Sequence, residues 1–238
     1  MHLLPQPAAW DEIMASIPAV NAKSSYWQNL VNDWGADREV FKLSWGKLMM
    51  WIFLLSDTFI FSIFLIGYMN VRMSATDSWP LTSEVFALHV GGADIPLLLI
   101  AIMTFILITS SGTMAMAVNC AYQRNKAATF KLMIATAILG ASFVGMQAFE
   151  WSKLILDEGV RPWSNPMGAA QFGSAFFMIT GFHGMHVSIG VIYLTVVAFK
   201  VLRGHYDERG FQIVEITGLY WHFVDLVWVF IFAFFYLW

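Results

Sequence analysis

Cysteine and charged residues are both scarce in this chain of 238 residues. Cys120 is its one cysteine, which excludes an internal disulfide, and nothing near it in the sequence resembles a Cys/His metal cluster. Asp, Glu, Lys and Arg make up 12% of the residues, whereas soluble domains average about 25%. The net charge of -3 supplies no basic surface for nucleic acid.

Hydrophobic residues dominate instead, at 58% of the chain, and the mean hydropathy is +0.64. Five apolar stretches are each long enough to cross a bilayer core of about 30 Å at about 1.5 Å per residue. The sequence therefore predicts an all-α integral membrane bundle of five transmembrane helices, over about residues 43–69, 94–122, 127–156, 169–202 and 211–238.

Turn-forming and polar residues separate these stretches. Asp94 is expected to cap the second helix, with Pro96 in its first turn. Residues 1–42 are polar and lack the continuous apolar core of a signal peptide. We therefore predict two regions, a peripheral N-terminal arm over residues 1–42 and a five-helix transmembrane domain over residues 43–238.

The basic residues predict the orientation, because Lys and Arg are retained on the cytoplasmic side of a membrane. Ten of the thirteen Lys and Arg residues belong to the N-terminal arm, the first-helix entry and the two connectors expected on the same side. The other three are Arg72, Lys153 and Arg161. The N-terminus is thus expected inside and the C-terminus outside, in agreement with an odd number of spans.

Small residues let membrane helices approach closely. Three stripes of small residues are expected at helix contacts, on the second, third and fourth helices: Thr109, Thr113 and Ala117; Ala137, Ala141 and Gly145; Gly181, Gly184 and Ser188. Aromatic residues of the fifth helix are expected to face lipid or to pack, and Tyr236 and Trp238 suit the outer interfacial belt.

Ionisable side chains inside the spans are the candidate functional residues, because such groups are costly in a membrane and need partners. They are Asp57, Glu150, His183, His186, Glu215, His222 and Asp225. On the fifth helix, His222 and Asp225 are three residues apart and can approach each other directly.

Two interpretations of these groups remain open from the residues alone. Three histidines with carboxylates could bind iron or zinc or relay protons, as in an intramembrane metalloenzyme or a proton-coupled transporter. Alternatively, they hydrogen-bond neighbouring helices, at about 0.6 kcal/mol per contact. No His-Glu-x-x-His signature favours the metal site, and no internal inverted repeat favours a transporter.

Asp57 differs from the other candidates because Lys47 is the nearest basic residue, close to the interface. Without a partner its carboxyl would be neutral or bound to water, which suggests a proton-linked or lipid-linked site. Arg161, beside Pro162-Trp163, could hold a lipid headgroup or extend to the interface without a ligand.

Four motifs carry a resemblance to a known family. They are Trp45-Gly46-Lys47 with Ser56-Asp57, residues 146–150 (MQAFE), residues 180–187 (TGFHGMHV) and residues 220–228 (YWHFVDLVW). Over about residues 43–238 their order, spacing and helix placement resemble subunit III of haem-copper terminal oxidases. The larger version of this family has seven helices, and this chain lacks the first two.

The resemblance implies a subunit with no redox cofactor, metal or catalytic residue of its own. Such a subunit packs against catalytic subunit I, which carries haem and copper, binds phospholipid, and supports proton uptake in a proton-pumping oxidase that reduces oxygen to water. Asp57 falls where many members carry a buried, carbodiimide-reactive glutamate.

The location that the resemblance implies is the bacterial plasma membrane rather than the mitochondrial inner membrane. Residues 1–42 lie outside the resemblance and could dock to other oxidase subunits or a respiratory supercomplex. Related five-helix proteins accompany nitric oxide reductases, which leaves an alternative complex. The electron donor, cytochrome c or quinol, stays open.

Overall fold

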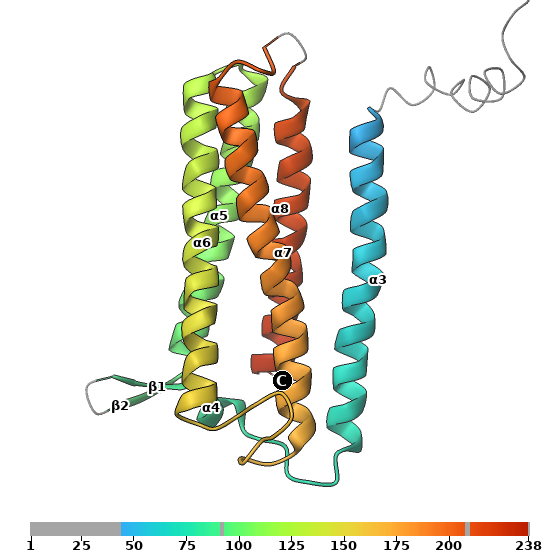
Figure 1. Cartoon of the computed structure of the whole chain (residues 1–238), viewed down its shortest axis with the longest axis vertical. Coiled ribbons are helices and arrows are strands. Elements are labelled where there is room, and N and C mark those ends of the chain that lie inside the picture. The colour runs from blue at the N-terminus through green and yellow to red at the C-terminus, as the bar shows by residue number, and fades with distance from the viewer. Residues whose placement is uncertain (1–43, 91–92, 208–209, 238) are drawn as a thin grey trace, which may run out of the picture. The chain divides into compact units, whose positions relative to one another are not determined.

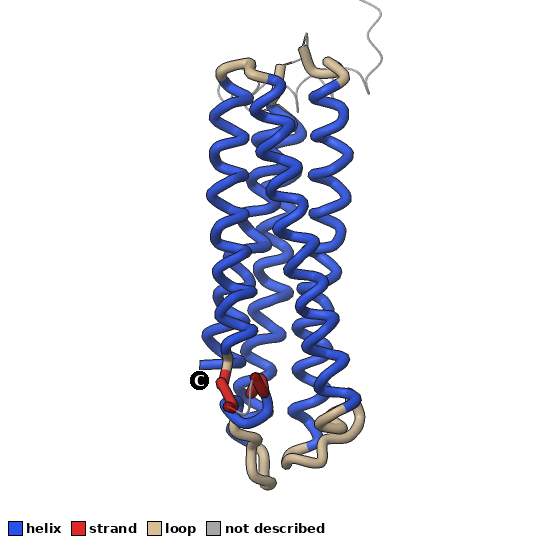
Figure 2. Tube along the Cα trace, turned by 90° about the vertical axis from the view of Figure 1, so that its left-hand side faces the viewer, coloured by secondary structure: helices blue, strands red, loops and turns tan. Residues whose placement is uncertain are grey.

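The computed structural model describes residues 44–90, 93–207 and 210–237. Most of them are helical (Figures 1 and 2). The long helices are α3 (Trp45–Ser74), α5 (Leu98–Tyr122), α6 (Lys126–Leu156), α7 (Ala170–Leu202) and α8 (Gln212–Ile231), and α8 continues as the π-helix η2 (Phe232–Leu237). The predicted N-terminal arm and Trp238 lie outside the described residues.

Within the described residues, five helices, with η2 included in the last, are long and apolar enough to cross a membrane, which confirms the prediction of an all-α protein with five spans. Mean hydropathy in their most apolar stretches runs from 1.7 to 2.1. The predicted side of the membrane for each terminus stays a prediction.

The connector between α3 and α5 was predicted incorrectly. It contains a short helix, α4 (Thr82–Val85), and an antiparallel hairpin of β1 (Ala87–Val90) and β2 (Ala93–Pro96). Asp94 and Pro96 therefore lie in a strand and do not cap a helix. The residue before α5 is Leu97, whose φ of 59° breaks the strand conformation.

The helices α5 to α8 form a group in which α5 packs against α6 and α8, and α7 packs against the same two helices. Helix α3 packs against α8 and α7 (Figure 1). Its buried side chains follow one stripe with spacings of three and four residues: Leu54, Asp57, Phe61, Leu65 and Tyr68. One face of α3 therefore meets the group.

Glycine allows the closest approach inside the group. A Cβ at Gly140 of α6 would lie 2.3 Å from the Trp221 ring, and one at Gly190 of α7 would lie 3.0 Å from the same ring. The Trp221 indole of α8 thus fits between two helices that lack side chains there. The predicted stripe at Gly181 and Gly184 does face α6, through Trp151 and Gln147.

The stripe predicted on the third span was partly wrong. Ala137 is buried, but Ala141 and Gly145 are exposed, and nothing lies within 4 Å of a Cβ at Gly145. The buried face of α6 instead includes Met133, Thr136, Gly140 and Phe143.

Candidate functional site

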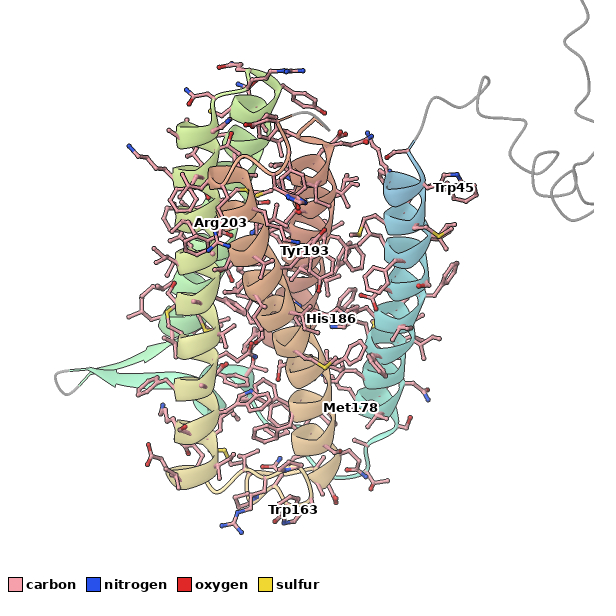
Figure 3. All side chains as sticks on the ribbon, turned by 45° about the horizontal axis from the view of Figure 1, so that its top comes forward. Trp45, Trp163, Met178, His186, Tyr193 and Arg203 are labelled. Carbon is pink, nitrogen blue, oxygen red and sulfur yellow. The ribbon has the colours of Figure 1, made fainter. Side chains whose placement is uncertain are left out.

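Asp57 of α3 and His186 of α7 meet in the middle of the structure. Asp57 is 3% exposed and His186 is 7% exposed. Asp57 Oδ2 lies 3.3 Å from His186 Nε2, within ion-pair distance, although the angles do not meet those of a hydrogen bond. His186 points from α7 toward α3 in Figure 3. The partner of Asp57 is thus a histidine from a distant part of the sequence.

The second nitrogen of His186 has a partner on its own helix. His186 Nδ1 lies 2.8 Å from the carbonyl oxygen of Phe182, and because a carbonyl only accepts, Nδ1 carries a proton. Unprotonated Nε2 and ionised Oδ2 would face each other with lone pairs. A hydrogen bond between these two atoms would therefore need a proton on one of them.

Aromatic side chains surround this pair. The Phe182 ring lies 4.7 Å from the His186 ring and the Phe61 ring lies 5.6 Å from it, both edge-on. Tyr220 of α8 donates a hydrogen bond of 3.0 Å to the His186 carbonyl oxygen. The pair therefore joins α3, α7 and α8 in apolar surroundings.

An apolar groove of about 310 Å³ runs between α3 and α8. The Phe61 side chain lines this groove and also contacts the His186 ring. Its lining is almost wholly hydrocarbon, with Leu65 and Met69 on one side and Phe223 and Phe230 on the other. Such a groove fits an acyl chain and offers little to a charged ligand.

His183, one helical turn before His186, belongs to a different environment. It is fully buried, with its ring stacked 5.3 Å from Trp228 and edge-on to Phe143 at 5.9 Å. Neither ring nitrogen has a hydrogen-bond partner among the described residues. His183 therefore packs chiefly against α6 and α8, and its ring also lies 6.4 Å from the Phe61 ring of α3, whereas His186 meets Asp57 of α3.

Glu150 of α6 is 4% exposed and accepts a hydrogen bond from the Tyr236 hydroxyl, at 3.3 and 3.4 Å to its two oxygens. Tyr236 is 1% exposed. The interfacial position expected for Tyr236 was therefore wrong: the tyrosine points into the protein. Its partner was not foreseen because the contact joins residues 86 positions apart.

His222 and Asp225, predicted to approach each other, lie on the α8 face toward α5. His222 Nδ1 lies 2.6 Å from the Ser111 hydroxyl of α5. Asp225 Oδ1 has no hydrogen-bond partner among the described residues. The packing role predicted for these residues stays a prediction, and Ser111 is the neighbour that the sequence did not indicate.

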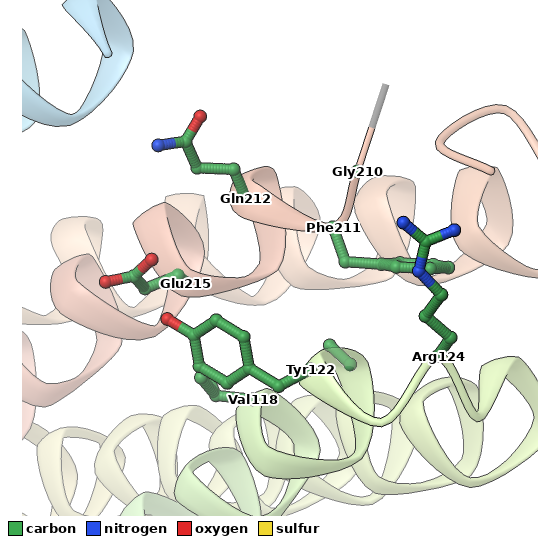
Figure 4. A pocket seen from close by; sticks show the side chains of 8 residues that line it. Val118, Tyr122, Arg124, Gly210, Phe211, Gln212 and Glu215 are labelled. Atoms are coloured by element: carbon green, nitrogen blue, oxygen red, sulfur yellow. The ribbon is translucent and has the colours of Figure 1, made fainter. Parts of the chain in front are cut away.

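Glu215, at the start of α8, forms an ion pair with Lys47 at the start of α3. It also lines a pocket of about 340 Å³ with Tyr122, the last residue of α5, and Arg124 in the turn that follows, as Figure 4 shows. Arg161 is exposed in the loop before α7, where its backbone pairs with that of Ser164.

The candidate ligands do not converge. Across the described ranges, no three His, Cys, Asp or Glu side chains gather where they could hold one metal ion. The residues that suggested a metal site are divided among separate contacts, each between two helices. Those contacts are Asp57 with His186, Glu150 with Tyr236, His222 with Ser111, and Glu215 with Lys47.

Five apolar spans with buried polar contacts between them define a multi-pass helical membrane protein. The model of the family described as cytochrome c oxidase subunit III matches residues 13–238, and the chain belongs to this family. The match reaches back to residue 13, so the expectation that all of residues 1–42 lie outside the resemblance was wrong.

Two relatives carry the description "Probable quinol oxidase subunit 3". The protein from Staphylococcus epidermidis is 34% identical and that from Staphylococcus aureus is 32% identical, each over 188 residues. These matches span 79% of this chain and 86% of each relative. The chain is therefore a non-catalytic subunit of a respiratory terminal oxidase complex, and the other oxidase subunits are its partners.

Proposed function

We propose that this chain stabilises catalytic subunit I of a proton-pumping oxidase that reduces oxygen to water. Haem and copper belong to that partner. The complex lies in a bacterial plasma membrane, with the N-terminus of this chain inside and its C-terminus outside. The bacterial relatives support the location, and the basic residues support the orientation.

The contact between Asp57 and His186 carries the proposal that this subunit also supports proton uptake. It brings two ionisable side chains together between α3 and α7. The neighbouring apolar groove supports a bound phospholipid, with its acyl chain between α3 and α8. Arg161 is a candidate contact for a lipid headgroup, because its side chain is exposed in a loop at the end of the spans.

The remaining buried polar groups are proposed to fix the packing of the helices and the surface that faces the partner. Each lies between two helices or faces a neighbouring helix: Glu150, His183, His186, Glu215, His222 and Asp225. Residues 1–42 are proposed as a peripheral arm that contacts other subunits or a respiratory supercomplex.

Asp57→Asn in the assembled oxidase tests the proton-linked role. Asparagine keeps the size of the side chain but cannot exchange a proton, so turnover is expected to slow, or activity to decay faster during turnover, without loss of haem. Asp77→Asn, at an exposed loop position, is the matched control. Unchanged pumping, turnover and lifetime in Asp57→Asn would leave this residue only a packing role.

Purification from native membranes in mild detergent tests the assignment to a complex. The chain is expected to co-purify with a haem-copper subunit that consumes oxygen. A partner that reduces nitric oxide instead would favour an accessory subunit of a nitric oxide reductase. Stoichiometric iron, copper or haem on the isolated chain would contradict the subunit assignment and favour an enzyme in its own right.

A further inference from the structure

Glu150 and Tyr236 form a buried pair on helices other than those of Asp57 and His186. Glu150 lies on α6, and Tyr236 lies on η2 at the end of the last span. In η2 each turn is wider than in an α-helix, and such turns recur at functional sites. Thr82 of α4 donates a hydrogen bond of 3.2 Å to the Tyr236 carbonyl oxygen and ties this turn to the connector.

The geometry of the pair argues against an ionised carboxylate. A hydroxyl that donates to a charged carboxylate normally lies about 2.5–2.7 Å from it, whereas the Tyr236 oxygen lies 3.3 and 3.4 Å from the two Glu150 oxygens. Aromatic rings enclose the tyrosine, including Phe86 at 4.7 Å and Trp228 at 6.1 Å. A carboxylate here would have the Tyr236 hydrogen bond and the charge of Lys153, which lines the same pocket, as its stabilising contacts. A full negative charge in such apolar surroundings would still be costly.

A small pocket borders Glu150. Its volume of about 10 Å³ is close to the smallest that holds one water molecule. Glu150 lines it together with Lys153, which lies one turn further along α6, and with Phe86 and Ile100 from the connector and α5. Among the described residues that border the carboxyl, Tyr236 and Lys153 are the ones that can titrate.

We propose that Glu150 and Tyr236 form a second proton-binding site, in which Glu150 is a neutral carboxylic acid that exchanges its proton with one water molecule in the pocket beside Lys153. The exchange moves one proton between the carboxyl and water and leaves the tyrosine hydroxyl intact. The site is separate from Asp57: it joins α6 to η2, whereas Asp57 and His186 join α3 to α7.

Infrared spectroscopy of the purified oxidase complex at neutral pH tests this site, because a protonated carboxyl group has a carbonyl band that a carboxylate lacks. The band of Glu150 is expected to be lost in Glu150→Gln and kept in Asp57→Asn. Glu158→Gln, the same substitution in the loop after α6, is the matched control. A carboxylic acid region identical in the wild-type and Glu150→Gln complexes would overturn the proposal.

Tyr236→Phe keeps Glu150 and serves if Glu150→Gln fails to assemble. Loss of the hydroxyl donor should shift the same band to higher frequency, and an unchanged band would contradict the pair. Transfer of the intact complex to heavy water tests the pocket. A band that moves to lower frequency supports access by water, whereas a band that never exchanges would refute it.

Discussion

Helix α3 and the group of α5 to α8 are held in different ways. Within the group, the Trp221 ring fits between Gly140 and Gly190. By contrast, 22% of the most apolar stretch of α3 is buried, half the 44% found for the last span. The group therefore depends on the shapes of many side chains, whereas α3 depends on a few contacts that can each be removed.

The polar contacts follow the same division. Two indole groups of α8 donate hydrogen bonds of 3.0 Å to α5, from Trp221 to Ser110 and from Trp228 to Thr104. Helix α3 is held by the Lys47–Glu215 ion pair at one end and by the Asp57–His186 contact in the middle. These two polar contacts of α3 therefore consist of ionisable groups, and the polar contacts of α5 with α8 mostly of neutral ones.

Gly140→Ala should produce the largest effect, because the new Cβ would lie 2.3 Å from a Trp221 ring that Gly190 confines on its other side. We expect a loss of about 1–3 kcal/mol in the free energy of unfolding, the usual cost of overpacking. Unfolding in mixed micelles measures it. Gly145→Ala, on the open side of the same helix, should cost far less, and equal losses in both variants would contradict the tight packing.

Thr104→Val should have an intermediate effect. The substitution keeps the shape of the side chain and removes the acceptor of the Trp228 indole N–H. The expected loss is about 0.6–1.7 kcal/mol in the free energy of unfolding, the range from the mean to the maximum for hydrogen bonds between membrane helices. Thr109→Val is the control, since the Thr109 hydroxyl is exposed and bonds only within its own helix, to the Phe105 carbonyl oxygen. A control as damaging as Thr104→Val would show that the indole bond is not the cause.

The Lys47–Glu215 ion pair should have the smallest effect. Its two side chains are 24% and 23% exposed, so screening by water and salt reduces the interaction. A double-mutant cycle with Lys47→Met and Glu215→Gln should give a coupling of about 0.2–1 kcal/mol that falls as salt is added. A larger coupling that is insensitive to salt would mean that α3 is held about as firmly as the helices of the α5 to α8 group.

The sequence predicted the long helices well because their signal is local. Length and apolar composition decide whether a segment crosses a membrane, and neither depends on the rest of the fold. The hairpin of β1 and β2 was missed because Asp94 and Pro96 also have the composition of a helix start. Gly140, where the Trp221 ring of α8 comes closest to α6, was missed because Ala141 and Gly145 made an equally plausible stripe of small residues.

The candidate site was predicted as a set of residues but not as pairs. Costly groups such as Asp57 and Glu150 stand out in an apolar sequence. Their partners do not, because tertiary packing alone decides that Asp57 meets His186 while His183, three residues earlier, meets Trp228. Tyr236 resembled an interfacial aromatic residue because the sequence around it carries no sign of a π-helical turn. In the structure this turn contains Tyr236, whose side chain is buried.

That turn has an evolutionary consequence. A π-helical turn contains more residues than an α-helical turn, so η2 accommodates added length without moving α8. A deletion of one residue within Phe232–Leu237 would thus preserve the helix in the membrane but present a different side chain to Glu150. The spacing between the YWHFVDLVW motif and the tyrosine is therefore a trait to compare among relatives.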